Sequence, residues 1–164
     1  MVFNGKPTRE WVTREDSASP TAAQESIMLT AVIDATERRD VMTSDIPNAF
    51  IQAELKEVED GDERVMMKIT GVLVDMLVEL NPQLYGPHVV YEKRGKVLYV
   101  QVLRVIYGML VSAILWYNKL RGGLEGAGFK FNPYDPCTAN RPMKGSQHTV
   151  LFHVDDLKSS HKDK

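Results

Sequence analysis

One stretch of the sequence constrains the fold more than any other, because the β-branched and aromatic run Thr149–Val154 leads directly into Asp155 and Asp156. Such a run predicts a strand that ends in a turn. A second run, Val41–Asp45, predicts another strand that ends in an aspartate. Two strand ends can be neighbours in one sheet however far apart they lie in the chain. The sequence therefore allows Asp45 and the acidic pair to converge.

A pair of aspartates after a strand is by itself common in surface turns, where water satisfies the charge. Three converging carboxylates are less common, because like charges a few ångströms apart repel unless a cation neutralises them. Mg²⁺ prefers hard oxygen ligands and usually takes one or two carboxylates together with substrate phosphates. Two such ions can activate an attacking hydroxyl and stabilise a leaving oxygen in phosphoryl transfer. The aspartates therefore predict a site for two Mg²⁺ ions, or Mn²⁺ in their place, and nucleotidyl transfer.

Two long helices are predicted. Ser19 is a candidate N-cap and Pro20 a candidate first helical residue of a helix that runs to about Arg39. Its apolar positions 27, 28, 31, 32 and 35 form one stripe, which is expected to face the core. The second helix runs from Met109 to about Ala127, with apolar positions 111, 114, 115, 120 and 124 and with Gly126 and Gly128 as stop signals.

The remaining patterns add short elements between and before these helices. They predict a helical turn or two over residues 48–55, a strand Val65–Ile69, and a β-hairpin of Val89–Glu92 with Val97–Val102. They also predict a buried helix Val72–Leu80, although the run is short enough to allow a strand instead. Residues 1–18 are expected to form an irregular arm, and the acidic segment 57–63 a solvated turn. With no internal repeat or linker, the sequence predicts one compact α+β unit.

Composition excludes several classes of protein. Hydrophobic residues make up 43% and charged residues 26% of the chain, as in ordinary globular domains. The single cysteine, Cys137, rules out an internal disulfide, and no apolar run suggests a secretory signal or a membrane span. The net charge of −2 gives no global attraction to nucleic acid. Phosphate contacts would need local basic patches, for which the candidates are residues 93–96, 119–130 and 158–164.

Several short motifs in a fixed order resemble one known family. Asp45-Ile-Pro-Asn-Ala-Phe50 and His153-Val-Asp-Asp156 resemble the two acidic segments of copia-type retrotransposon reverse transcriptases. Between them, Ile106-Tyr-Gly-Met109 and Trp116-Tyr117 are similar to further elements of that family. Ser19-Pro20-Thr21, Gly128-Phe129 and Asp135-Pro136-Cys137 also match in the right order. An ordered set of this kind is far more specific than any single motif.

The resemblance implies a right-hand polymerase fold, with partial fingers and a palm over residues 19–164, truncated before the thumb. The palm would be an antiparallel sheet with helices packed on one face. Asp45, Asp155 and Asp156 would bind the metal ions, with the backbone carbonyl of Ile46 as a further ligand. Ile46, Asn48, Ala49 and Phe50 would bind the nucleotide, and the Phe50 ring would exclude a 2′-hydroxyl.

The implied partners are an RNA template, a DNA primer, deoxynucleotides, and the integrase, thumb and ribonuclease H parts of a polyprotein, with no membrane. The expected location is a cytoplasmic retrotransposon particle or the nucleus, and not a secretory compartment. Val111-Ser112-Ala113 stands where many family members carry Gln-Ala-Pro, which removes an amide expected near the nucleotide.

Two other classes of function stay open on the sequence. One is an inactive or domesticated remnant of the same fold that binds nucleic acid or a partner protein. The other is a metal-dependent nuclease or phosphatase, which would explain the aspartates but not Phe50 or the Tyr-Gly and Trp-Tyr elements. His153 would lie near the primer end by resemblance, or serve as a hydrogen-bonded structural residue of a half-buried strand. Cys137 is expected to be structural, since no orienting group for a Cys-His nucleophile is apparent.

Overall fold

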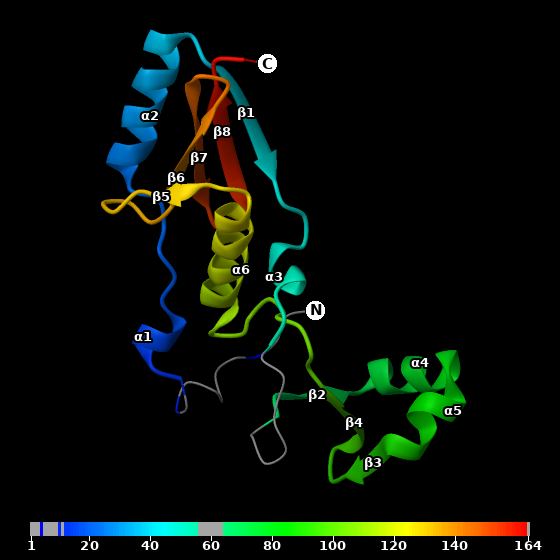
Figure 1. The fold of residues 1–164 in the computed structure, drawn as a ribbon. Coiled ribbons are helices and arrows are strands. Elements are labelled where there is room, and N and C mark those ends of the chain that lie inside the picture. Colours follow the sequence, from blue (N-terminus) through cyan, green and yellow to red (C-terminus); the bar gives the residue numbers. More distant parts are fainter. Residues whose placement is uncertain (1–3, 5–9, 11, 56–63, 164) are drawn as a thin grey trace. The chain divides into compact units, whose positions relative to one another are not determined.

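The computed structural model describes residues 4, 10, 12–55 and 64–163. The chain divides into two compact units, one formed by residues 1–53 and 105–164 and the other by residues 54–104. Each unit has its own antiparallel sheet and its own helices (Figure 1). The predicted α+β class is therefore confirmed. The expected single unit is corrected, because the chain folds around two separate apolar cores.

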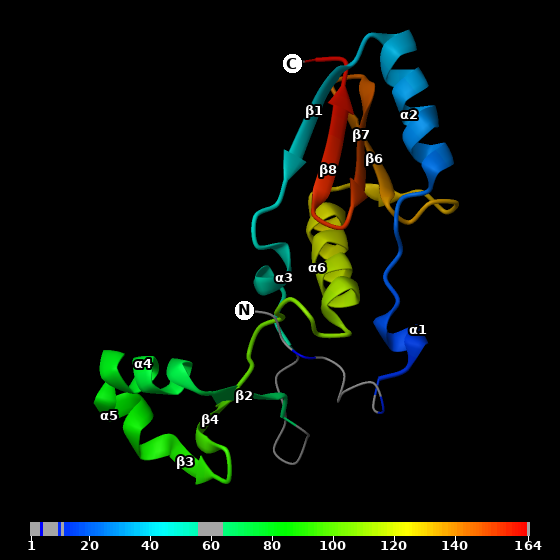
Figure 2. The same ribbon diagram turned by 180° about the vertical axis from the view of Figure 1, so that it is seen from behind.

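The first unit contains a five-stranded antiparallel sheet. Its strands, in spatial order, are β1 (Asp40–Asp45), β8 (Asp156–His161), β7 (Ser146–His153), β6 (Thr138–Met143) and β5 (Lys130–Phe131). Figure 2 shows β1, β8, β7 and β6 side by side, as Figure 1 does from the opposite side. The predicted strand at β1 is confirmed. Strand β8 lies between β1 and β7 in the sheet. It was not predicted, because its sequence is mostly polar and has no alternation of apolar and polar residues.

Helix α6 (Ser112–Gly126) covers one face of this sheet with an apolar interface. Tyr117 of the helix packs with Val150 and Phe152 of β7, and Ile114, Leu120 and Leu124 add to the same core. The prediction of this helix is confirmed, although it begins three residues later than expected. Two short helices, α1 (Arg14–Ser17) and α3 (Ala49–Gln52), also belong to this unit.

Helix α2 (Gln24–Glu37) begins later than predicted, and the side of it that faces the sheet is not the predicted apolar side. Its N-cap position is Ala23, so Ser19 and Pro20 precede the helix. The predicted apolar stripe faces solvent, with Met28 and Val32 exposed at 59% and 63%. The buried residues of α2 are Thr30 and Asp34. The stripe prediction is therefore wrong, because this helix attaches to the sheet through polar groups.

Three sets of polar contacts hold α2 to the rest of the unit. At its N-terminus, the Ala23 amide donates to Oδ2 of Asp135 over 3.3 Å. In its middle, Lys158 Nζ lies 2.6 Å from Oδ2 of Asp34 and donates to Thr30 Oγ1 over 3.0 Å. Just beyond its C-terminus, Arg39 Nη1 donates to Thr149 Oγ1 over 3.0 Å.

The two long helices lie on opposite faces of the sheet. Successive residues of a strand point to opposite faces, and directly paired residues of neighbouring strands share one face. Thr149, which contacts the α2 region, therefore points away from Val150 and toward the face of its partner Ser160. Lys158 belongs to that same face, whereas Val150 and Phe152 belong to the face of α6. The expectation that the helices pack on one face is therefore wrong for this sheet.

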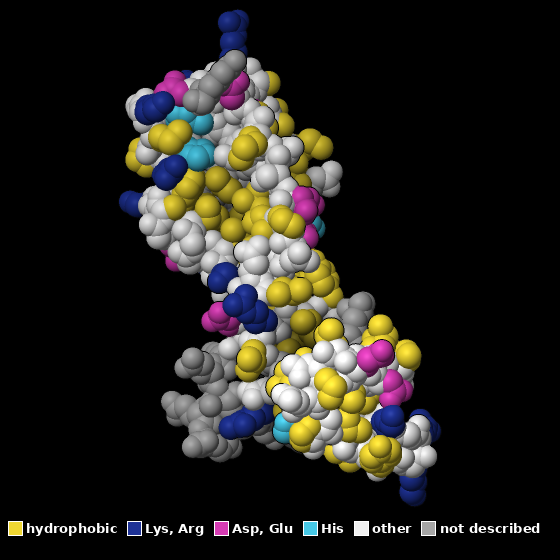
Figure 3. All heavy atoms as spheres, turned by 90° about the vertical axis from the view of Figure 1, so that its right-hand side faces the viewer, with side chains coloured by type: hydrophobic (Ala, Val, Ile, Leu, Met, Phe, Trp, Pro, Cys, Tyr) yellow, Lys and Arg dark blue, Asp and Glu magenta, His cyan; other side chains and the backbone are white. Residues whose placement is uncertain are grey.

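The second unit has a three-stranded sheet in the order β2 (Met66–Thr70), β4 (Gly95–Gln101) and β3 (Val89–Glu92). Helices α4 (Val72–Leu80) and α5 (Pro82–Tyr85) and the 3₁₀ turn η2 (Gly86–His88) join the strands. The predicted helix and hairpin are confirmed here, but the expected burial of the helix is wrong, because Val74 is its one buried residue. Ile69, Val74 and Leu98 form the core. Figure 3 shows hydrophobic side chains on the surface of this unit, where Val72 and Leu80 are 70% and 79% exposed.

Some predictions fall only partly within the described residues. The acidic segment 57–63 lies outside them, as do most residues of the predicted N-terminal arm before residue 12. The described part of that arm includes α1, which was not predicted. Within the part of the chain that the structure describes, no helix has both the length and the apolar character that crossing a membrane requires.

Candidate active site

Two of the three predicted aspartates are direct neighbours across a strand pair. Asp45 is the last residue of β1 and Asp156 is the first residue of β8, and the two are Cα partners in the antiparallel register. Partners of this kind share a face, with their Cβ atoms about 4.5–5.5 Å apart. The Ile46 amide donates to the carbonyl of Asp155 over 3.0 Å, which extends the pairing by one step. The predicted convergence of Asp45 and Asp156 is confirmed.

The pairing of these carboxylates has a physical consequence. Like charges directly opposite one another in a sheet are destabilising. Both side chains are exposed, so water and dissolved cations can reach them. Two hard oxygen donors at one sheet edge, open to solvent, form a donor set that suits Mg²⁺ or Mn²⁺, since Mg²⁺ commonly takes two carboxylates and keeps several waters.

The third aspartate occupies a different position. Asp155 lies in the two-residue turn between β7 and β8, with its side chain half-buried, and its contact with β1 is made by its backbone carbonyl. Among residues 12–55 and 64–163, no group of three or more His, Cys, Asp or Glu side chains gathers closely enough to hold a metal ion. The fold therefore brings together two of the predicted ligands and leaves the side chain of the third in the adjacent turn.

The turn that carries the acidic pair is strained. Val154 has a φ of +59°, a left-handed conformation that is unusual for a β-branched residue. Such a conformation costs on the order of 1–3 kcal/mol and persists only where the surroundings hold it. Trp116 of α6, which is only 3% exposed, donates from Nε1 to the Val154 carbonyl over 2.8 Å. Trp116 therefore anchors the turn of the acidic pair, a role that the sequence motif did not reveal.

An open groove of about 510 Å³ runs along the face that carries Asp45 and Asp156. His153, the cross-strand partner of Asp156, lies at its edge, and Leu151 and Ile27 give it apolar walls. His153 is exposed, so the alternative that it is a half-buried structural residue does not apply. The carboxylates thus border a groove that is open to solvent.

The residues after Asp45 form a tight connection into α3. Asn48 adopts a left-handed conformation with a φ of +55° and is exposed, whereas Ile46 is half-buried. Ala49 is only 1% exposed, so its side chain packs inside the unit. The predicted roles of these three residues in binding metal and nucleotide remain predictions.

Phe50 is held by a second motif residue. Its ring and that of Tyr107 meet edge to face with centroids 4.7 Å apart. Phe50 is half-buried and therefore keeps part of its ring accessible. Nearby in the sequence, the Oγ of Ser112 lies 2.9 Å from the carbonyls of both Ile106 and Met109, which closes the loop before α6. Ser112, which stands where many members of the resembled family carry alanine, therefore makes structural hydrogen bonds to the backbone of this loop.

Several of the basic candidates are paired with acidic partners. Lys96 Nζ lies 2.6 Å from Asp75, and Arg121 contacts Glu125 over 3.0 Å. Lys158 is paired with Asp34, as described above. These contacts favour solvated or structural ion pairs over a phosphate-binding patch at these three positions.

Cys137 is a buried structural residue, as expected. It is fully buried in the core beneath α6. Burial, with a smaller contribution from the charge of Asp135, raises the pKa of the Cys137 thiol to about 11. A thiol of this kind is protonated at neutral pH and is a poor nucleophile.

Comparisons of the chain with models of known protein families, with curated proteins and with solved structures found no match.

Proposed function

We propose that the chain is an RNA-directed DNA polymerase module of a retrotransposon polyprotein. In this proposal the sheet of residues 40–45 and 130–161 is the palm of a right-hand polymerase, and the unit of residues 54–104 is a partial fingers region. The reaction is transfer of a deoxynucleotide to the 3′-hydroxyl of a DNA primer on an RNA template. The proposal rests on the ordered motifs of the sequence together with the geometry of the acidic residues.

The observation that carries the proposal is the pairing of Asp45 with Asp156. These residues come from the two segments that resemble the acidic motifs of the copia-type family, far apart in the sequence. Their pairing follows from the register of β1 and β8. It puts two carboxylates on the same face of the sheet beside an open groove. A shared solvent-exposed face is what joint binding of a divalent ion requires.

Asp45 and Asp156 would hold the metal ions in this proposal, with the Asp155 carboxylate and the Ile46 carbonyl as additional ligands. Bound Mg²⁺ or Mn²⁺ would favour deprotonation of the primer hydroxyl and neutralise charge on the leaving oxygen. The chain fixes the positions of these ligands through the β1–β8 register and through the contact of Trp116 with the turn.

Phe50 would select the sugar of the nucleotide by its shape. Its ring is held against Tyr107, which limits its freedom to move aside. A ring packed against C2′ leaves room for a hydrogen atom but not for a hydroxyl group. The side chain of Phe50 would therefore favour deoxynucleotides over ribonucleotides.

The test is primer extension on an RNA template with Mg²⁺ and deoxynucleotides, comparing the chain, extended by the thumb and the other flanking segments that the resemblance implies, with the Asp156→Asn and Asp155→Asn variants of the same protein. Asp40→Asn is the matched control, because Asp40 is an exposed residue at the other end of the same β1–β8 ladder. We expect activity in the chain and in the control, and only background in Asp156→Asn. Equal activity in the chain and both active-site variants would refute the metal assignment.

A second candidate function is nucleic-acid binding by an inactive remnant of the same fold. It is favoured by the absence of a three-residue metal group among the described residues and by Val111, which stands where many members of the resembled family carry glutamine. Calorimetric titration of Mn²⁺ in the presence of a deoxynucleotide distinguishes the two candidates. Heat of binding that disappears in Asp156→Asn supports the polymerase. No heat, together with retained binding of an RNA–DNA duplex, supports the remnant.

A further inference from the structure

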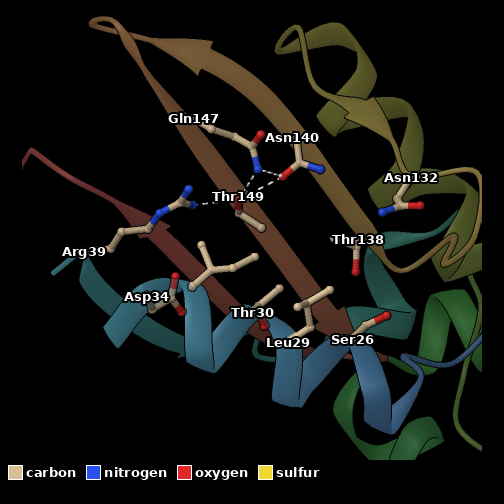
Figure 4. Close-up of a pocket in the computed structure, with 11 residues that line it drawn as sticks. Ser26, Leu29, Thr30, Asp34, Arg39, Asn132, Thr138, Asn140, Gln147 and Thr149 are labelled. Carbon is tan, nitrogen blue, oxygen red and sulfur yellow. Dashed lines mark hydrogen bonds between the residues drawn. The ribbon is translucent and has the colours of Figure 1, made fainter. Parts of the chain in front are cut away.

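A second cavity lies between α2 and the opposing strands β6 and β7, away from the paired aspartates. It has a volume of about 100 Å³ and opens to solvent beside Leu29. Figure 4 shows Thr30 and Asp34 reaching toward it from the helix, and Asn140 and Thr149 bordering it from the strands. Every group that borders it belongs to the first unit.

The sheet side of the cavity offers hydrogen-bond donors in fixed orientations. The Oδ1 of Asn140 accepts from Gln147 Nε2 over 2.8 Å and from Thr149 Oγ1 over 2.9 Å. The Oδ1 of Asn132 accepts from the Tyr134 amide over 2.8 Å. Because both carbonyl oxygens are already engaged, each side chain presents its NH₂ group. Figure 4 shows the amide nitrogens of Asn140 and Asn132 on the sides of the two residues that face each other.

The helix side offers acceptors. Asp34 is only 6% exposed, and within the described residues its Oδ1 accepts no hydrogen bond. Its Oδ2 is paired with Lys158 Nζ at 2.6 Å. A buried carboxylate oxygen without a hydrogen-bond donor is costly, and buried polar groups in proteins are almost always satisfied by protein, water or ligand. The cavity is therefore expected to contain a donor.

The charges around the cavity are balanced. Asp34 is paired with Lys158, and the buried Arg39 contacts Glu37 over 3.0 Å. A charged ligand would disturb one of these pairs, so a neutral molecule fits better. A single water requires roughly 10–15 Å³ of such volume, so the cavity is several times larger than one water needs. Its wall also contains the apolar side chains of Leu29 and Ile33, which cannot hydrogen-bond to water.

We propose that this cavity is a binding site for a small, flat, neutral molecule with a donor edge and an acceptor edge, which is the chemistry of a nucleobase. The donor edge would face Asp34, and the acceptor edge would face the NH₂ groups of Asn140 and Asn132. Leu29 and Ile33 would contact the flat surface. The proposal does not depend on polymerase activity, because no residue of the paired-aspartate site takes part.

The test is a titration of the ¹⁵N-labelled chain with free cytosine and adenine, followed by amide chemical shifts. Toluene serves as a flat ligand without hydrogen-bonding edges. We expect saturable shifts in β6 and β7 with the bases and none there with toluene. If toluene shifts the same amides with equal affinity, or if neither base produces saturable shifts in the folded protein, the site is not a nucleobase site.

Two matched substitutions on α2 locate the binding. Leu29→Trp places a large ring at the mouth of the cavity, whereas Met28→Trp places it one position away, at an exposed residue that does not line the cavity. We expect loss of the shifts in the Leu29 variant and retention in the Met28 variant. Equal binding by both variants would put the bases elsewhere and overturn the proposal.

Asp34→Asn tests the chemistry of the helix side. Losing a hydrogen bond to a charged group is expected to weaken binding about tenfold or more. Asp40→Asn, which changes an exposed aspartate that does not itself line the cavity, should bind as the unmodified chain does. Because Asp34→Asn also breaks an ion pair, its amide spectrum must show a folded chain. Unchanged affinity in a folded Asp34→Asn variant would contradict the proposed orientation.

Discussion

Helices α2 and α6 have similar lengths, 14 and 15 residues, and cover opposite faces of the same sheet in opposite ways. Helix α6 packs through an apolar core around Tyr117 and Phe152. Helix α2 is held by hydrogen bonds and an ion pair, and its most buried residues are Thr30 and Asp34. The comparison teaches that the inward face of a helix is set by the surface it meets as well as by its own apolar stripe.

The two faces of the sheet differ in polarity, which explains why the two helices attach differently. Its α6 face presents Val150 and Phe152, whereas its α2 face presents polar residues such as Thr149 and Lys158. A helix with apolar residues turned toward that polar face would leave buried donors and acceptors without partners, which costs more than exposing a few apolar side chains. The paired aspartates belong to the same polar face, so α2 and the candidate active site share one surface.

The largest expected effect is on the α6 side. Phe152→Ala removes a side chain that is 2% exposed and leaves a cavity against Tyr117. We expect a loss of about 4 kcal/mol in the free energy of unfolding, as for other large-to-small core substitutions. Urea unfolding followed by circular dichroism measures it. A loss below about 1 kcal/mol would mean that α6 does not rest on this core.

The next effect concerns the ion pair beneath α2. Lys158→Met keeps most of the side-chain volume but leaves the carboxylate of Asp34 buried without its cation, with an expected loss of about 3 kcal/mol. Adding Asp34→Leu removes the unpaired charge and should restore most of the stability. The same unfolding measurement applies. A double variant no more stable than Lys158→Met would show that polar contacts other than this pair decide how α2 attaches.

A smaller effect, dependent on pH, is expected at the N-terminus of α2. Burial alone would raise the pKa of Asp135, but hydrogen bonds from Ser26, the amides of Cys137 and Ala23, and Thr138 outweigh it and hold the pKa below its ordinary value of 3.8. Because the folded pKa is lowered, the unfolded chain binds more protons in acid. The stabilisation is therefore fully present above pH 3.8 and is lost as the pH falls below it.

Asp135→Asn isolates this contribution. The variant keeps a capping side chain but has no charge to titrate, and we expect it to lose about 1 kcal/mol at neutral pH. The free energy of unfolding is measured between about pH 6 and about pH 2, in steps of roughly one pH unit. It should fall less steeply with decreasing pH in the variant than in the unmodified chain. Identical slopes would rule out Asp135 as the pH-sensitive contact of α2.

The smallest effect is expected on the outer face of α2. Val32→Ser changes a residue that is 63% exposed, and valine and serine have similar helix propensities. The free energy of unfolding should change by less than about 0.5 kcal/mol. Leu120→Ser on α6 is the matched comparison and should cost clearly more, because Leu120 packs on the apolar core. Equal losses in the two variants would remove the contrast between the helices.

Local sequence patterns determined most of the individual elements. The apolar run Val72–Leu80 and its Asn-Pro stop predicted helix α4 with the observed bounds. The β-branched and aromatic residues on either side of Lys93 and Arg94 predicted the β3–β4 hairpin. The strand that ends at Asp45 was also predicted. These features follow from the sequence because propensities, caps and turn residues act over a few neighbouring positions.

Only the tertiary structure decided how these elements meet. Strand β8 had no apolar alternation to announce it, yet its register with β1 is what brings Asp156 beside Asp45. The N-terminus of α2 is capped by Asp135, from a distant part of the chain, instead of by the local Ser19. Strand register and long-range caps depend on packing between segments far apart in sequence. No local pattern encodes them. The sequence therefore supplied the carboxylates, and the register of β1 and β8 determined which two of them are cross-strand partners.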